Sequence, residues 1–266
     1  MTDAVESDGA MFDDTRSLNV SGSPAGDFFA YSFGRSHHAT NRDQSGLPLM
    51  MVDGHPVVPL PSRARSTQLA LKRIMDIVLA GGALIVLLPL LVGIALAIRL
   101  SGKGSVLFRQ SRPGLDGQPF ELLKFRTMRH DACDVEGLKQ ATSNDERVTR
   151  LGKFLRATSL DELPQLWNIL IGEMSIIGPR PMVSGMLAVG RDYRELVPYY
   201  DFRLLMKPGL SGWAQANGFR GPTDALGPAI ARIDHDCAYI QNFSVALDIK
   251  TIAQTLVREF ITGTGL

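Results

Sequence analysis

The chain has 266 residues, of which 45% are hydrophobic and 21% are charged, so it can bury the core of one domain with appendages or of two small domains. Its formal net charge of +1 combines an acidic stretch over residues 1–60 with a basic remainder, and a basic body suits a partner that carries phosphates or an anionic lipid surface. Cys133 and Cys237 match no metal or redox spacing, which argues against a disulfide scaffold and favours reduced thiols in a cytoplasmic domain.

Residues 1–65 are predicted to be a disordered or loosely ordered leader, because they are rich in Gly, Ser, Asp and Pro and show no sustained periodicity. The runs 48–52 and 56–59 could form brief extended pieces, but neither is long enough to anchor anything. No cleavable signal peptide is visible, since the first long apolar stretch starts too late and lacks a small-residue cleavage pattern. We therefore expect the leader to be dispensable for chemistry.

Residues 66–104 contain an apolar run, from Ile74 to Ile98, of about the length needed to span a bilayer. Pro89 lies near its middle, where it removes a helical hydrogen bond and bends the chain. Basic residues flank both ends, which draws both ends to the cytoplasm. A bent re-entrant hairpin that enters and leaves one leaflet satisfies both signals, but a straight spanning helix with a proline kink stays open. The flanking residues are Arg63, Arg65, Lys72 and Arg73 on one side and Arg99, Lys103, Arg109 and Arg112 on the other.

Residues 105–266 are predicted to form a mainly helical cytosolic domain with a small β-hairpin, which makes the fold class α+β. The β-prone runs 106–108 and 120–125 flank Asp116 and Gly117, and Asp-Gly between two such runs is a hairpin signal. A helix is expected from about Asp161 to Ile171, with Leu163, Leu166, Trp167 and Leu170 on one face and Gly172 as its stop. Residues 131–147 are predicted to be a surface helix or loop, and further helices are expected in parts of 184–206, 224–241 and 245–261.

The segment 199–206 is apolar and aromatic and allows two interpretations. Its side chains could lie in the plane of the membrane surface as part of an amphipathic helix. They could equally be ordinary core residues, and the sequence does not choose between the two. The residues concerned are Tyr199, Tyr200, Phe202, Leu204, Leu205 and Met206.

Two adjacent carboxylates, Asp161 and Glu162, are predicted at a helix N-terminus, because Pro164 is tolerated only in a first helical turn. The simplest interpretation is structural: Asp161 caps the helix and Glu162 complements its dipole. An adjacent pair of acidic residues does not by itself indicate catalysis.

The basic residues around this pair suggest phosphoryl chemistry. Arg156 lies just upstream, Lys124 and Arg126 lie on the preceding strand, and Arg180 is stiffened by Pro179 and Pro181. Arginine suits bidentate contact with phosphate, and a carboxylate together with phosphate oxygens is the usual Mg²⁺ arrangement. Each basic residue taken singly could instead be a solvated surface charge.

Six short motifs occur in a fixed order over residues 68–266, and together they resemble the bacterial sugar transferase family. These are monotopic phosphoglycosyl transferases that begin exopolysaccharide and glycan assembly. One such motif is unspecific, but six in order are highly specific. The leader has no counterpart in the minimal form of the family. The motifs span residues 72–76, 124–128, 158–165, 172–175, 178–181 and 208–213.

The resemblance implies a mechanism and roles for the site residues. Asp161 matches the family nucleophile, which attacks the phosphate next to the sugar of a UDP-sugar, releases UMP and leaves an aspartyl-phosphosugar for undecaprenyl phosphate to attack. Mg²⁺ is implied at Asp161, where it neutralises the pyrophosphate. Glu162 is implied to assist at the metal or at the lipid phosphate. The implied substrate-binding residues are Lys124, Arg126, Arg156, Arg180 and Pro181.

The implied setting is the bacterial inner membrane, with the catalytic domain facing the cytoplasm and membrane lipids as partners. The stretch 212–221 resembles that of hexose-transferring members, so UDP-glucose or UDP-galactose is the expected donor. No nucleic acid is expected as a partner, and a homodimer is compatible with the sequence without being indicated by it. Two rival functions stay open: a nucleotide-sugar pyrophosphatase or hydrolase that needs no lipid, and a non-catalytic scaffold tethered to the membrane.

Overall fold

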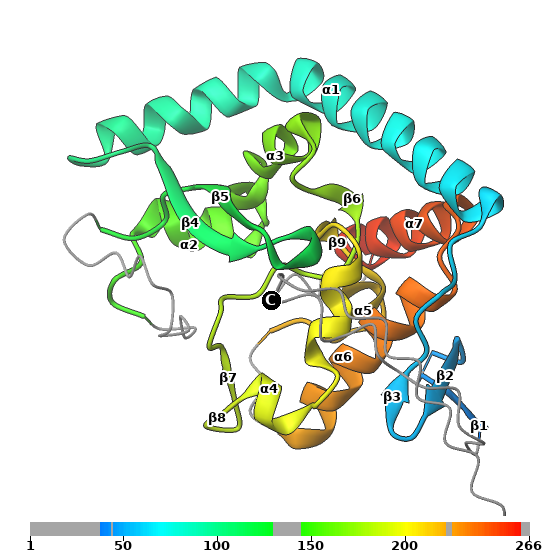
Figure 1. Ribbon diagram of the computed structural model, residues 1–266. Coiled ribbons are helices and arrows are strands. Elements are labelled where there is room, and N and C mark those ends of the chain that lie inside the picture. The colour runs from blue at the N-terminus through cyan, green and yellow to red at the C-terminus, as the bar shows by residue number, and fades with distance from the viewer. Residues whose placement is uncertain (1–37, 44, 130–144, 222–224, 262–266) are drawn as a thin grey trace, which may run out of the picture. The chain divides into compact units, whose positions relative to one another are not determined.

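The computed structural model describes residues 38–43, 45–129, 145–221 and 225–261. Residues 37–266 form one compact unit through their own contacts, with helices and short sheets mixed along the chain (Figure 1). Residues 1–37 of the expected leader and most of the polar stretch 131–147 lie outside the described residues.

The helix α1 (Arg63–Leu100) is the longest element of the described part and contains the expected membrane anchor. Ser62 caps its N-terminus, where the Ser62 Oγ accepts a hydrogen bond from Arg65 N at 3.1 Å, and the helix continues without a break through Pro89. The turn of a helix-hairpin is therefore not present in this segment. Figure 1 shows instead a bent helix that arches over α3, as a proline inside a helix causes by removing a hydrogen bond.

Both halves of α1 pack against the same body. In the first half Lys72, Asp76 and Ala80 are buried at a spacing of four residues, which places them on one face of the helix. In the second half Ile94 and Ile98 pack in a cluster with Phe125 and Leu155. The two ends of the helix are thus held on one side by the rest of the domain.

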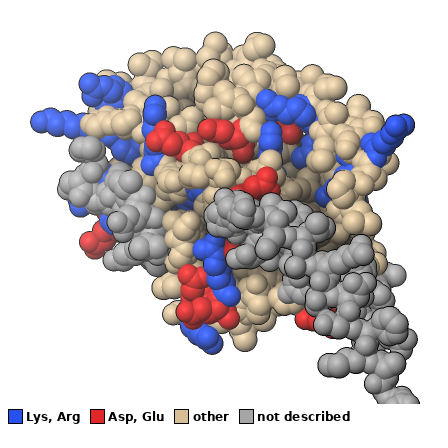
Figure 2. All heavy atoms as spheres, viewed as in Figure 1, with Lys and Arg blue, Asp and Glu red and all other residues tan. Residues whose placement is uncertain are grey.

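The opposite face of α1 is apolar and exposed. No charged residue occurs from Ile77 to Ile98. Within the described residues, α1 is the helix that is long and apolar enough to cross a membrane, by length and composition alone. Figure 2 shows an uncharged expanse along the top of the view, where α1 runs in Figure 1. The side chains most exposed on this face are Ile74, Val78, Ile85, Val86, Leu88, Val92, Leu96 and Leu100.

The expected β-hairpin is confirmed. Strand β4 (Leu107–Pro113) pairs antiparallel with β5 (Pro119–Phe125), in a register that runs from Leu107 opposite Phe125 to Pro113 opposite Pro119. The turn includes Asp116 at a φ of 53°, a left-handed conformation that Asp tolerates better than most residues.

The predicted helix over 161–171 is divided in two. A 3₁₀ turn covers Leu160–Glu162, and α3 (Gln165–Ile171) starts after Pro164, so the first turn of α3 lies beyond the carboxylates. The predicted apolar face is partly wrong, because Trp167 is 52% exposed while Leu166 is buried. Helix α2 (Arg150–Ala157) precedes this region and ends before the 3₁₀ turn.

Asn168 of α3 joins this helix to the hairpin. Its Oδ1 accepts from Leu123 N at 3.1 Å, and its Nδ2 donates to Glu121 O at 2.7 Å. The buried amide therefore completes the backbone bonding of β5 on one side. This contact fixes the strand that carries Lys124 relative to the segment that carries the two carboxylates.

The main core gathers the C-terminal half of the chain. Within it Tyr200, Phe202 and Met206 are buried, so the core interpretation of 199–206 holds for these three residues and the interpretation as membrane-plane side chains does not. The parallel pair of β6 and β9 runs through this half. Its elements are β6 (Ser175–Ile177), β7 (Leu187–Ala188), β8 (Arg191–Asp192), α4 (Tyr193–Leu196), a 3₁₀ turn (Tyr200–Leu205), β9 (Gly209–Ser211), α5 (Trp213–Ala216), α6 (Leu226–Gln241) and α7 (Val245–Ile261).

A three-stranded sheet in the expected leader also packs on this core. It consists of β1 (His38–Arg42), β2 (Pro48–Val52) and β3 (His55–Pro56) in that order. The Gln241 side chain accepts from Met50 N and donates to Met50 O, both at 2.8 Å, as a neighbouring strand would.

The same sheet makes two buried contacts as well. Leu49 enters the main core, and Asp43 accepts from Trp213 Nε1 at 2.8 Å. The expectation that 48–52 is too short to anchor anything is therefore wrong. Residues far along the chain supply the hydrogen bonds and apolar contacts that a short strand cannot make by itself.

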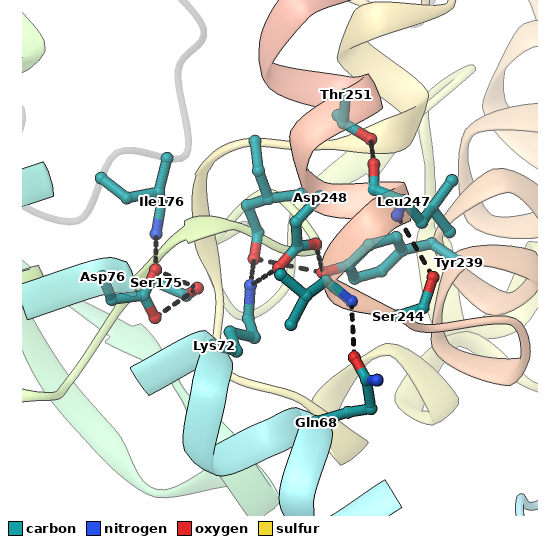
Figure 3. A network of polar contacts seen from close by, with 12 residues as sticks. Gln68, Lys72, Asp76, Ser175, Ile176, Tyr239, Ser244, Leu247, Asp248 and Thr251 are labelled. Carbon is teal, nitrogen blue, oxygen red and sulfur yellow. Dashed lines mark hydrogen bonds and ion pairs between the residues drawn. The ribbon is translucent and has the colours of Figure 1, made fainter. Parts of the chain in front are cut away.

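A buried polar network fastens α1 to the body (Figure 3). Lys72 Nζ donates to Asp248 Oδ2 at 2.7 Å and to Ile177 O at 2.8 Å, and Tyr239 donates to the same carboxylate at 2.6 Å. One turn further along α1, Asp76 accepts from Ser175 Oγ at 2.8 Å and from Ile176 N at 2.9 Å. Two buried charged side chains, Lys72 and Asp76, thus fix the position of α1 on β6.

Candidate active site

The two carboxylates lie together in the turn between α2 and α3. Ser159 precedes them at a φ of 55°, and this left-handed residue turns the chain sharply after α2. Asp161 is 8% exposed and Glu162 is 9% exposed. An ionised carboxylate this deeply placed needs a partner charge or a ligand, because burial disfavours the charged form.

Glu162 has two partner charges. Its Oε1 accepts from Lys124 Nζ at 2.8 Å and from Arg180 Nη2 at 2.8 Å. Burial alone would raise the pKa of Glu162, but the charges of Arg180 and Lys124 outweigh it and hold that pKa well below its usual value. Glu162 in turn raises the pKa of Arg180. The three side chains form a charged cluster that joins β5, the 3₁₀ turn and the segment after β6.

Asp161 has no such partner. Its carboxylate makes no hydrogen bond or ion pair within the described residues, and no side-chain cap is found for the 3₁₀ turn or for α3. The capping interpretation of Asp161 is therefore wrong. Burial raises the pKa of this carboxyl, opposed by the charge of Lys124 and reinforced by that of Glu162.

Two of the predicted basic residues besides Lys124 lie near Asp161. Arg156 and Arg180 both stabilise its charged form, and Arg156 is held in place by a bond from its Nε to Thr127 Oγ1 at 2.9 Å. The segment that carries Arg180 is fixed from behind, because Arg203 Nη2 donates to Arg180 O at 2.6 Å. The chain thus brings Lys124, Arg156 and Arg180 together around the carboxylates, as the sequence predicts.

Glycine is required where this segment meets β9. A Cβ on Gly209 would lie 2.1 Å from Gly178 N, a distance that no side chain could accept. The close approach lets Gly178 N donate to Ser211 O at 2.9 Å and Gly209 N donate to Pro179 O at 3.0 Å. The glycines of two separate motifs therefore serve one contact, which sets the backbone that leads to Arg180 and Pro181.

Arg126 lies elsewhere. Its Nη1 donates to Lys103 O at 2.7 Å and its Nη2 to Gly102 O at 3.3 Å, so its guanidinium binds carbonyl groups just beyond the end of α1. Strand β5 ends at Phe125, and the alternation that would place Arg126 on the same face as Lys124 ends with it. We leave Arg126 out of the candidate site.

Sequence reasoning missed two arginines. Arg112 on β4 and Arg220 after α5 both lie close enough to Arg180 for its charge to lower their pKa, after the larger effect of burial. The signal for Arg112 was its position two residues after Gln110, which places the two side chains on one face of β4. Arg220 gave no signal beyond its position in the stretch 212–221.

The described residues contain no cluster of three or more His, Cys, Asp or Glu side chains that could hold a metal ion. The donor set still fits Mg²⁺ in its usual enzyme arrangement, which needs one or two carboxylates with substrate phosphates and waters. Asp161 offers that carboxylate, since no described group occupies its oxygens.

Comparison with known proteins shows to which family the chain belongs. A family model described as bacterial sugar transferase matches residues 67–262. The chain is 49% identical over 197 residues to the exopolysaccharide production protein PSS of Rhizobium leguminosarum bv. phaseoli, which covers 74% of this chain and 98% of that protein.

Two longer relatives are named as transferases. The identity is 47% over 211 residues to the UDP-glucose:undecaprenyl-phosphate glucose-1-phosphate transferase of Escherichia coli K12, covering 79% of this chain and 45% of that protein. It is 40% over 196 residues to the UDP-N-acetylgalactosamine-undecaprenyl-phosphate N-acetylgalactosaminephosphotransferase of Aeromonas hydrophila, covering 73% of this chain and 44% of that protein. The matched region thus spans less than half the length of both relatives.

The relatives named as undecaprenyl-phosphate transferases, together with the one helix of the described residues that is apolar enough to cross a membrane, indicate a membrane-associated transferase. The chain belongs to the bacterial sugar transferase family, as the order of its motifs predicts. The family match starts at residue 67, so the β1–β3 sheet lies outside it.

Proposed function

We propose that this enzyme transfers a hexose-1-phosphate from a UDP-sugar to undecaprenyl phosphate, releases UMP and so initiates exopolysaccharide or glycan assembly. UDP-glucose is the first donor to test, because the Escherichia coli relative is named for it, and UDP-galactose is the second. The observation that carries the proposal is the Asp161 carboxylate, which is nearly buried, lies beside cations and has no described partner.

The reaction takes two displacements at one phosphorus. An Asp161 oxygen forms a bond to the phosphorus next to the sugar, the bond from that phosphorus to the bridging oxygen breaks, and UMP leaves with the electron pair. A phosphate oxygen of undecaprenyl phosphate then attacks the same phosphorus and releases the Asp161 carboxylate. The covalent intermediate divides one difficult exchange into two easier ones.

The cations bind and orient the phosphates in this scheme. Lys124 and Arg180 are fixed by Glu162, so in our proposal Glu162 is a positioning residue rather than a ligand of the lipid phosphate. Arg156 stabilises the charged form of Asp161 and adds positive charge where phosphate oxygens would lie. Charge fixed in advance stabilises the transition state without reorganisation during the reaction.

Mg²⁺ is proposed to be held by Asp161 and the diphosphate, where it would neutralise phosphate charge. The rest of the site is already cationic, which is consistent with a metal bound largely through the substrate rather than by a protein cage.

The membrane arrangement is proposed to be re-entrant, with the catalytic domain on the cytoplasmic side of the inner membrane. The support is that both halves of α1 pack on one body, so a straight span would require the body to lie on both sides of the bilayer. Basic residues at both ends of α1 agree with this topology. Single cysteines in place of Leu60 and Arg109, in a chain without native cysteines, should both resist labelling from the periplasm. Labelling of either one from that side would refute the topology.

Trapping the intermediate tests the chemistry. The purified chain is incubated with UDP-glucose and Mg²⁺ without lipid, and its peptides are examined by mass spectrometry. We expect a hexose-phosphate adduct on the peptide that contains Asp161, together with release of UMP. Strict dependence of UMP release on lipid, or an adduct on another residue, would refute the covalent role. Steady release of free hexose phosphate without lipid would indicate a hydrolase instead.

A further inference from the structure

Arg112 is held rigidly at the edge of the candidate site. Its Nε donates to Gln110 Oε1 at 3.1 Å and its Nη2 donates to the same oxygen, while its Nη1 donates to Pro181 O at 3.3 Å. Gln110 is itself buried. A guanidinium held on two sides cannot swing away into solvent, and this side chain is only partly buried, so a ligand can still reach it.

The acceptors of Arg112 are neutral, which distinguishes it from the arginines whose acceptors carry negative charge. Arg203 pairs with Asp236 at 2.7 Å. Arg73 donates to Ile169 O and Leu170 O at the end of α3, where the helix dipole is negative. Arg112 pairs with no carboxylate within the described residues, and it does not lie at a helix end.

A second cation lies next to it. Burial, and after it the charge of Arg180, lowers the pKa of Arg112 to about 10, with a smaller opposing effect from Glu162. Arg112 also binds the carbonyl of Pro181, the residue that follows Arg180, whose own guanidinium pairs with Glu162. The positive charges of Arg112 and Arg180 repel each other, and an anion bound by both would offset this cost.

We propose that Arg112 is a phosphate-binding residue of this site and that Arg112 and Arg180 together bind the diphosphate of the nucleotide sugar. The inference rests on the proposed function and adds a residue to it. A diphosphate is the ligand class that fits, because planar guanidinium forks match phosphate oxygens and two adjacent forks match a doubly charged group. The two bonds to Gln110 leave other N–H groups of Arg112 for such a ligand.

The competing explanation is that Arg112 only fastens the Pro181 carbonyl and never contacts a ligand. Affinity for ligands with and without phosphate separates the two. Binding of UDP-glucose and of uridine is measured by calorimetry on the full chain in detergent, in an Asp161→Asn background that blocks turnover. Arg112→Gln and Arg112→Lys are compared with Arg109→Gln on the same strand, whose side chain is exposed and pairs with Glu121.

We expect Arg112→Gln to weaken UDP-glucose binding by about tenfold or more, as loss of a hydrogen bond to a charged group does, while uridine binding changes less than about twofold. Arg112→Lys keeps the charge without the fork and should give an intermediate loss. Arg109→Gln should bind both ligands like the Asp161→Asn parent.

Equal losses for UDP-glucose and uridine would overturn the proposal, because they would mean that the segment has moved. Unchanged UDP-glucose affinity in both Arg112 variants would overturn it too, even if turnover of the same variants in the active background fell. If the Asp161→Asn parent bound no UDP-glucose at all, the proposed function itself would fail. Thermal unfolding of each variant shows whether it is folded. If Arg112→Gln is not folded, the comparison is made with Arg112→Lys alone.

Discussion

Replacing Lys72 with Met should destabilise the protein strongly, because it leaves a carboxylate buried without its cation. The side chains of Lys72 and Asp248 are 5% and 0% exposed, and the atoms that pair are 2.7 Å apart. Burial raises the pKa of Asp248, and Lys72 is the largest effect that opposes it. Removal of one partner of a buried pair costs about 3–5 kcal/mol, whereas an exposed pair contributes about 0–1 kcal/mol.

The partner of Lys72 provides the internal check. Lys72→Met combined with Asp248→Asn should recover much of the loss, because Asn carries no charge and can still accept from Tyr239. Arg109→Met serves as the matched control, since its pair with Glu121 is exposed. Urea unfolding in detergent micelles, followed by tryptophan fluorescence, measures all four proteins, and buried Trp213 reports on the core.

We expect the free energy of unfolding to be highest for wild type and Arg109→Met, intermediate for the double variant and lowest for Lys72→Met. A loss in Lys72→Met no larger than that of Arg109→Met would refute the reasoning. Asp248 would then be uncharged in the folded protein, and the network would not fasten α1 to the body.

Three further outcomes follow from the same contacts. Asp161→Asn should lower transfer by orders of magnitude with little change in unfolding temperature, because no described bond is lost; near-normal transfer would contradict the nucleophile role. The pKa of Glu162 is depressed in the folded protein, so its ion pairs stabilise the protein above the unfolded pKa of about 4.3, and this stability is lost as the pH falls from there toward the lower folded pKa. Wild type should therefore lose more stability between pH 5 and pH 2 than Glu162→Gln, and equal losses would contradict it. Removal of residues 1–37 should leave the β1–β3 contacts intact, whereas removal of residues 1–57 should lower the unfolding temperature and shift Trp213 fluorescence to the red. Identical unfolding temperatures and spectra for the two truncations would show that the sheet contributes nothing to stability.

Local patterns predicted the elements whose stability is local. The hairpin of β4 and β5 follows from two β-prone runs around an Asp-Gly turn, and α6 and α7 follow from helical periodicity. The β1–β3 sheet could not be predicted in this way. Its contacts reach Trp213 and Gln241, far along the chain, and no local signal announces such partners.

The candidate site was likewise predicted in part from the sequence and in part only from the folded structure. The order of the motifs predicted that Lys124, Arg180 and Glu162 would meet, and they do. The capping role of Asp161 could be rejected only from the folded geometry, because an acidic residue before a helix is compatible with either role. Arg126 was wrongly predicted to lie at the site. Strand β5 ends at Phe125, and the sequence alone does not show where strand pairing, and the alternation of faces with it, stops.

The arch of α1 has a consequence for the lipid around it. In the proposed re-entrant topology, α1 acts as a wedge, because it takes up area in one leaflet and none in the other. Because the rest of the domain packs against both halves of α1, the bilayer in this topology would adapt to the shape of the helix. Membranes whose cytoplasmic leaflet is already loosely packed, because of curvature or lipids with small headgroups, should therefore bind the enzyme more readily than flat, tightly packed ones.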